Sequence, residues 1–254
     1  MKQINTYIAE KLKLNRDSGR HYNYHPEDRD ELRLLIQKLL KERGPDANLN
    51  DIDVSEITDM EDLFRELDPH NIDISEWDVS NVTNMDGIFY ECDNFNSDLS
   101  GWDVSNVENM QYMFTECEKF NSDLSKWDVS NVKHMNKMFM ECGNFNSDLS
   151  KWNVSNVKNM ESMFAYCEKF NSDLSKWNVS KVGNMFEMFR CCKKFNSDLS
   201  NWNVSNVVMM QEMFWNCENF DCDLSKWNIR DIANLQVMFY GCISLKKTPW
   251  WYKK

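Results

Sequence analysis

The stretch "FNSDLSKWDVSNVKHMNKMF", residues 120–139, returns at residues 145–164 as "FNSDLSKWNVSNVKNMESMF" and begins again at residue 170. Seven copies are clear, and an eighth is degenerate at residues 53–67 as "DVSEITDMEDLFREL". Two aromatic residues recur every 25 positions without an insertion, as Trp77, Trp102, Trp127, Trp152, Trp177, Trp202 and Trp227 and as Phe64, Phe89, Phe114, Phe139, Phe164, Phe189, Phe214 and Phe239. A strict period of this length is typical of a solenoid, in which each unit buries its apolar face against its neighbours.

Each repeat changes its apolar spacing part-way along. Ser80 can cap the first turn of a helix through its hydroxyl. The apolar residues that follow it are spaced as on one helix face, and they are Val82, Met85, Ile88, Phe89 and Cys92. In "SDLS", residues 97–100, one leucine between polar residues predicts a short strand. The sequence therefore predicts an α/β repeat solenoid of about eight strand-turn-helix coils, with strands on one face and helices on the other.

The two ends differ from the repeats and are expected to cap the stack. Residues 1–50 hold two amphipathic segments, "KQINTYIAEKLKL" and "HPEDRDELRLLIQKLLKERG", which predict an N-terminal helical cap. Residues 51–245 form the repeat solenoid, and residues 246–254 form a C-terminal cap or tail in which Pro249 breaks the pattern. Trp250 and Trp251 could cover the last coil, or the ends could instead bind a partner.

Charge and hydropathy limit the kinds of partner. The chain carries 29 basic and 41 acidic residues, a net charge of −12, which argues against nucleic acid and anionic membranes as partners. No apolar run resembles a signal peptide or a membrane span, so no membrane insertion is expected. We expect a cytoplasmic or virion-associated protein, with a surface location possible only by a non-classical route.

Two repeated columns could bind a ligand. Seven cysteines share the 25-residue period, namely Cys92, Cys117, Cys142, Cys167, Cys192, Cys217 and Cys242. We expect them to be buried free thiols, with zinc binding or disulfides as the alternative. Cys191 cannot also face inward on a helix and is expected to be exposed, as Cys222 could be. Seven aspartates are expected to form, together with asparagines, a hydrogen-bonded ladder from coil to coil, with a calcium ladder as the alternative: Asp73, Asp98, Asp123, Asp148, Asp173, Asp198 and Asp223.

Catalytic motifs are not evident in the sequence. Four histidines lie outside any repeated constellation, and no nucleophile elbow, phosphate loop or H-E-x-x-H motif occurs. We therefore expect no enzymatic activity, no cofactor and no metal site.

If the repeated residues form the scaffold, specificity is expected where the copies differ. Above all between residues 183 and 215, apolar or aromatic residues replace polar ones on the predicted outer face of the helices. The candidate partner-binding residues are Phe186, Arg190, Val208, Met209, Trp215 and Tyr240. Alternatively, these residues pack coil on coil. A rival surface is the strand face, where uniform Ser, Asp and Lys side chains would suit a repetitive ligand such as a glycan.

The repeated wording "F-N-x-D-L-S-x-W-[DN]-V-S-N-V-x-x-M-x-x-M-F" resembles the BspA-like leucine-rich-repeat surface proteins, whose repeat also occurs in Mycoplasma lipoproteins as a domain of unknown function. The resemblance covers about residues 51–245 and implies a right-handed leucine-rich-repeat-like solenoid with a role in binding or adhesion. Unexported members of this kind also occur in phages and large viruses. The expected function is a non-enzymatic scaffold that binds a protein partner; the alternatives are a structural component of an assembly such as a virion and a calcium- or glycan-binding adhesin.

Overall fold

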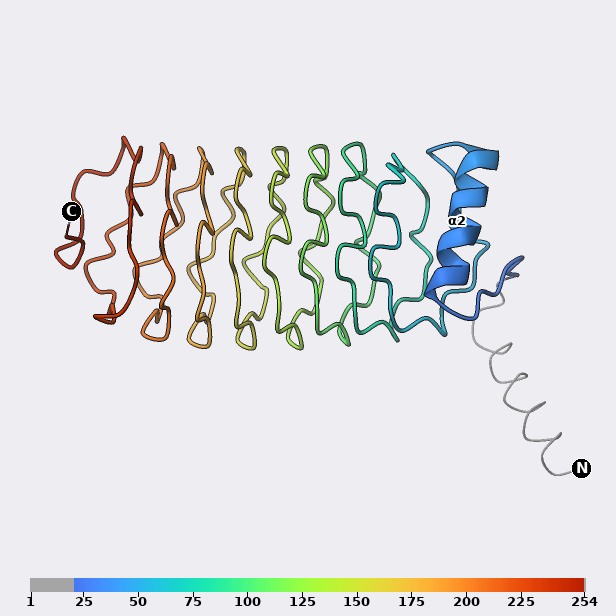
Figure 1. Cartoon of the computed structure of the whole chain (residues 1–254), viewed down its shortest axis with the longest axis horizontal. Helices are drawn as coiled ribbons and strands as arrows, with labels where there is room; N and C mark the ends of the chain where they lie inside the picture. The colour runs from blue at the N-terminus through green and yellow to red at the C-terminus, as the bar shows by residue number, and fades with distance from the viewer. Residues whose placement is uncertain (1–20, 254) are drawn as a thin grey trace, which may run out of the picture.

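The computed structural model describes residues 21–253. Coils follow one another along the long axis, from helix α2 (Arg29–Arg43) at one end to the C-terminus at the other (Figure 1). In the described part of the chain α2 is the single helix, and no helix there has the length and apolarity needed to cross a membrane. The segment "KQINTYIAEKLKL", expected to be helical, lies outside the described residues.

Neighbouring coils pair in parallel at one position per repeat. Isolated β-bridges join residues 25 positions apart, running from Asp59 through Asn84, Asn109, His134, Asn159, Asn184 and Met209 to Asn234. Two further parallel bridges lie at the N-terminal end and pair Tyr24 with Ile52 and Asn48 with Asp73. Within residues 21–253 no bridge involves residues 97–100, although Asp73, the equivalent of Asp98 one coil earlier, pairs with Asn48. The regular pairing of the clear repeats therefore lies at the Asn84 position rather than at the expected strand "SDLS".

The segment expected to be helical, residues 82–92, contains the bridge residue Asn84 followed by tight turns over residues 86–91. Alternate amides bond three residues back, as from Tyr90 to the Gly87 carbonyl at 2.9 Å, whereas the amides between them donate to the next coil. Gly87 itself donates to the Gln111 carbonyl at 2.9 Å. Ser80 does not cap a helix, because its amide and hydroxyl both donate to Asp78 Oδ1, at 3.1 and 2.6 Å. The helix prediction for the repeats was therefore wrong.

Left-handed backbone explains why no helix forms. Positive φ angles recur at two positions per coil, four residues apart, and a helix of L-residues excludes them. The first series is Asp62, Gly87, Tyr112, Lys137, Ser162, Glu187, Glu212 and Val237. The second series is Glu66, Glu91, Glu116, Glu141, Tyr166, Cys191, Asn216 and Gly241. The apolar residues still reach the core with helix-like spacing, because each turn returns the chain to the same face.

The core is built from columns of identical side chains. Phe114 and Phe139 stack with ring centroids 5.6 Å apart, and Trp127 and Trp152 stack at 6.4 Å with nearly parallel rings. The Trp127 indole Nε1 also donates to the Leu99 carbonyl of the preceding coil at 3.0 Å, and the bond recurs in each clear copy of the repeat. Apolar contact and a satisfied polar group therefore connect each coil to the one before it.

Helix α2 covers the first coil. Leu32, Ile36 and Leu39 are fully buried on its inner face. Asp28 accepts from the Glu31 amide at 2.9 Å as the N-cap, and Gly44 ends the helix with a φ of 89°.

The C-terminal tail extends the tryptophan column by one ring. Trp251 stacks on Trp227 at 6.1 Å and donates through Nε1 to the Leu224 carbonyl at 2.9 Å. Trp250 lies beside it and is 77% exposed.

Candidate functional site

Three of the six candidate residues form one stack. The Arg190 guanidinium lies over the Trp215 ring, 4.2 Å from its centroid, and the Trp215 ring stacks on Tyr240 at 5.7 Å. Tyr166, from the preceding coil, lies 5.8 Å from the same guanidinium. Cation–π and ring contacts therefore run across four successive coils.

Acidic side chains complete this stack. Arg190 Nη1 pairs with Glu187 Oε1 at 2.8 Å and with Glu212 Oε2. Burial lowers the pKa of Arg190, but the hydrogen bond and the charge of Glu187 outweigh it, and the net pKa is raised above its ordinary value. The charge is neutralised inside the stack. Coil-on-coil packing therefore accounts for Arg190 and Trp215, whereas Tyr240 is 62% exposed.

The other three candidates lie earlier in the turn region. Met209 bridges to Asn184 and Asn234 and is 40% exposed. Phe186 and Val208 are half-buried. Within residues 21–253 no ring contact joins Phe186 to the stack, so the structure does not gather the six residues into one cluster.

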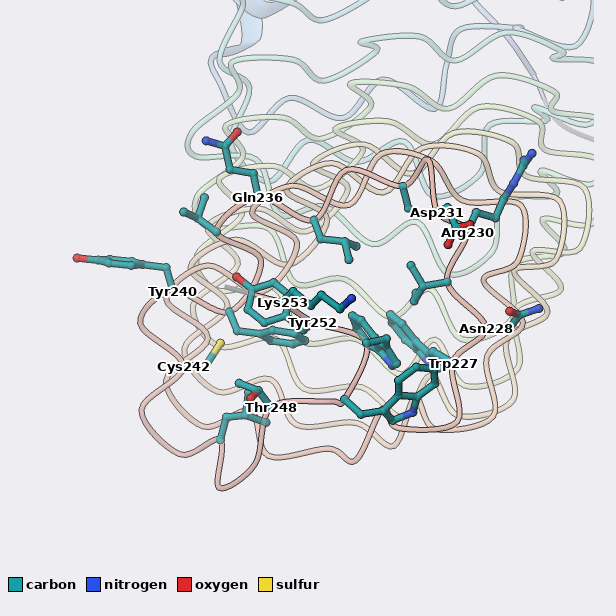
Figure 2. Close-up of a pocket in the computed structure, with 18 of the residues that line it drawn as sticks. Trp227, Asn228, Arg230, Asp231, Gln236, Tyr240, Cys242, Thr248, Tyr252 and Lys253 are labelled. Carbon is teal, nitrogen blue, oxygen red and sulfur yellow. The ribbon is translucent and has the colours of Figure 1, made fainter.

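The C-terminal end of the molecule is hollow. A cavity of about 1140 Å³ opens there, which we call the terminal hollow. Its lining includes Trp227, Phe239, Trp251, Tyr252, Arg230 and Lys253. Trp227, Tyr252 and Lys253 gather at its centre, while Tyr240 projects away from them (Figure 2). A concave site lined by aromatic residues with a few polar groups is the usual form of a binding site.

Large apolar side chains are exposed in the last coil, where Trp250 lines the terminal hollow and Ile232 and Ile243 are next in sequence to the lining residues Asp231 and Cys242. Ile232 is 67% exposed, although the equivalent valines of the earlier coils, such as Val182 and Val207, are fully buried. The difference arises because no further coil covers Ile232 in the described part of the chain. Ile243 and Trp250 are also exposed, at 80% and 77%.

Comparison with known proteins identifies the family of this chain. Residues 36–152 and 134–251 both match the family model described as "Mycoplasma protein of unknown function, DUF285". The chain belongs to the DUF285 family. Searches of curated proteins and of solved structures returned no match. The DUF285 match begins inside α2 and ends at Trp251, so it includes the lining of the terminal hollow except Tyr252 and Lys253.

The aspartate column of this DUF285 protein is bonded mainly within each coil. Asp123 Oδ1 accepts from the Ser125 amide at 2.9 Å, and this hydrogen bond holds the pKa of Asp123 below its ordinary value. Bonds between coils include Asp73, which accepts from Asn48 Nδ2 at 2.8 Å, and an asparagine column, in which Asn96 Oδ1 accepts from the Asn121 amide at 2.8 Å. The expected ladder of aspartates and asparagines therefore depends mainly on its asparagines. Among residues 21–253 no three acidic, histidine or cysteine side chains come together as a metal site.

The nine cysteines of the DUF285 chain are free thiols. Burial raises the pKa of Cys142 and its column well above the ordinary value. Cys191 is buried rather than exposed, since its left-handed backbone replaces the helix on which that prediction was based. Cys222 is half-buried, and burial raises its pKa to about 11. Thiols of this kind are poor nucleophiles and poor metal ligands at neutral pH.

Sequence reasoning overlooked Ile232 and Ile243. The position of Ile243 holds only polar residues or glycine in the earlier repeats, namely Asp93, Glu118, Gly143, Glu168, Lys193 and Glu218. An isoleucine in that column was therefore a detectable signal. Ile232 could not be recognised in this way, because an isoleucine in a valine column looks like core.

Proposed function

We propose that this DUF285 protein is a non-enzymatic repeat scaffold that binds a protein partner through the C-terminal end of its stack. The observation that carries the proposal is the concentration of exposed apolar residues around the terminal hollow. Exposed apolar clusters rimmed by polar residues are typical of interaction surfaces.

The contrast between the two ends supports this choice of surface. At the N-terminal end α2 buries its apolar face on the first coil. At the C-terminal end Ile232, Ile243 and Trp250 project into solvent, and tryptophan is among the residues that dominate protein interfaces. No coil within residues 21–253 covers this apolar face, and an exposed face of this kind favours a partner.

The proposal assigns no catalytic residue and no cofactor. The repeated serines and aspartates hydrogen-bond to one another, as Ser125 does to Asp123, and the repeated thiols are buried. These groups support the scaffold rather than a reaction.

We also infer kinship with the BspA-like leucine-rich-repeat proteins. The support is the 25-residue repeat with its Phe, Leu, Trp, Val and Met columns, which matches the wording of that family's repeat. Under this inference the stack is a leucine-rich-repeat-like solenoid with turns in place of helices.

The test is affinity purification from the native source with two matched variants. Ile232→Asp combined with Ile243→Asp removes apolar surface at the terminal hollow, whereas Leu34→Asp changes an equally exposed leucine on α2. We expect the first variant to retain its partner about tenfold or more less well, because burying an isoleucine contributes about 1.5–3 kcal/mol. The Leu34→Asp variant should behave as the parent protein.

Equal retention by both variants, with melting temperatures unchanged, would contradict the proposal. Recovery of only further copies of this chain would instead favour the assembly role.

A further inference from the structure

The backbone of the stack has a direction. From Met85 on, amides at four alternate positions of each coil donate to carbonyl groups 24 residues later. In the last complete set Met210, Glu212, Phe214 and Asn216 donate to Asn234, Gln236, Met238 and Tyr240. The first coil therefore presents carbonyl groups that no earlier coil can bond, and the last coil presents amides that no later described coil can bond.

At the N-terminal end a cation bonds two of these free carbonyl groups. The Arg33 guanidinium of α2 donates to the Leu63 carbonyl at 2.8 Å, to the Arg65 carbonyl at 2.9 Å and to the Asp62 carbonyl. The equivalents of Leu63 and Arg65 two coils later, Met113 and Thr115, belong to the accepting series. The Arg33 guanidinium therefore donates to carbonyl groups that would otherwise need an earlier coil as their donor.

The C-terminal end has no comparable acceptor in the described part of the chain. The Phe239 backbone hydrogen-bonds to the side chain of Tyr252. The amides of Leu235, Val237 and Gly241, which complete the same series, donate to no protein acceptor within residues 21–253. These three residues all line the terminal hollow.

The charge around the terminal hollow is opposite to that of the rest of the stack. Residues 228–254 contain five basic residues and one acidic residue, whereas residues 51–227 contain 14 basic and 32 acidic residues. Arg230 and Lys253 line the hollow together with Asp231 (Figure 2). Unpaired amide donors and basic side chains both favour a ligand rich in acceptors and negative charge.

We propose that the terminal hollow binds an acidic peptide segment of a partner protein, whose carbonyl groups bond to the free amides of Leu235, Val237 and Gly241 and whose carboxylates face Arg230 and Lys253. Apolar side chains of the segment pack on Ile232 and the aromatic lining. This inference rests on the proposed function and specifies the chemistry of the partner.

A second copy of this chain fits the site less well. Two C-terminal ends that meet would oppose amide donors to amide donors and basic residues to basic residues. Helix α2 of another copy offers free carbonyl groups only in its last turn, because the rest of its backbone is bonded internally, and that turn carries the basic residues Lys41 and Arg43. The N-terminal segment 1–20 carries five basic and two acidic residues, so its charge has the same sign as that of the hollow.

The test uses a fluorescein-labelled octapeptide of alternating aspartate and valine with a C-terminal amide, and its lysine–valine counterpart as the control probe. Fluorescence anisotropy with the full chain should show binding of the acidic probe alone. Binding should weaken as salt rises from about 0.05 to about 0.5 M, because exposed charges are screened. Saturating probe should also slow amide hydrogen exchange over residues 235–241.

Two charge-reversed variants complete the test. Arg230→Glu with Lys253→Glu should weaken binding of the acidic probe by about tenfold or more, whereas Lys151→Glu with Lys176→Glu, two exposed lysines in the middle of the stack, should leave it unchanged. Equal binding of both probes, no binding of the acidic probe, or no effect of the first pair would overturn the inference. The inference would also be overturned if mass photometry showed dimers of the parent protein and Arg230→Glu with Lys253→Glu abolished them. If partner retention nevertheless depends on Ile232 and Ile243, the proposed function stands and only the acidic specificity fails.

Discussion

Single residues with left-handed backbone decide the path of each coil. Most of them are not glycine, and an L-residue in this conformation costs about 1–2 kcal/mol. Hydrogen bonds along the stack offset that cost, as where Lys137 donates to the Glu161 carbonyl at 2.8 Å. Gly87 avoids the cost, and a Cβ atom there would lie 2.5 Å from Asp62 Oδ1. Val237 is the least suitable residue, because it is β-branched with a φ of 48°.

This strain predicts opposite effects for two substitutions. Gly87→Val should lower the free energy of unfolding by about 2 kcal/mol, and Val237→Gly should raise it by about 1 kcal/mol, measured by urea denaturation. Gly183→Val is the matched control, since Gly183 lies outside the left-handed series and Val208 occupies its equivalent position. Similar losses at Gly87 and Gly183 would show that side-chain volume, rather than backbone conformation, limits these positions.

At the scale of elements, the sequence predicted secondary structure correctly where local residues alone determine it. Helix α2 was predictable because Asp28, the leucine stripe and Gly44 form a complete start, face and stop. The turns of the repeats were not predictable, because the residue types found at positive φ, such as Lys, Glu and Tyr, are not typical of left-handed backbone. Apolar spacing over 82–92 therefore resembled a helix. The terminal hollow was also hidden, since burial of a repeated residue depends on whether another coil follows it.

Arg33 links α2 to the first coil, and its removal should be costly. Arg33→Leu keeps an apolar stem but leaves the carbonyl groups of Leu63 and Arg65 without their donors. We expect a loss of about 1.5–3 kcal/mol in the free energy of unfolding, measured by urea denaturation, with partial recovery in Arg33→Lys. The control is Lys38→Leu, at an exposed position of the same helix, which should be nearly neutral. Equal effects at both positions would mean that the guanidinium contacts contribute nothing.

Over the whole molecule, the stack is held by contacts between neighbours. Phenylalanine, tryptophan and backbone contacts repeat with the same geometry from coil to coil; the ring centroids of Phe139 and Phe164, for example, are 5.6 Å apart and those of Phe164 and Phe189 are 5.7 Å apart. Stability is then approximately a sum of coil terms and neighbour terms. The two ends differ in chemistry from the middle, since α2 covers one and the terminal hollow forms the other. The number of coils between them is therefore free to change without altering either end.

Removal of one complete repeat tests this description. Deletion of residues 126–150 joins Ser125 to Lys151 and preserves the repeat wording, so the shortened chain should fold cooperatively with slightly lower stability. Its urea m-value should fall by about a tenth, in proportion to the surface buried. Deletion of residues 126–137 removes about half a coil and misaligns every column, so that chain should lose cooperative unfolding. Because both ends are retained, the 25-residue deletion should also bind the acidic octapeptide as the full chain does. A shortened chain that fails to fold would show that the coils are not interchangeable.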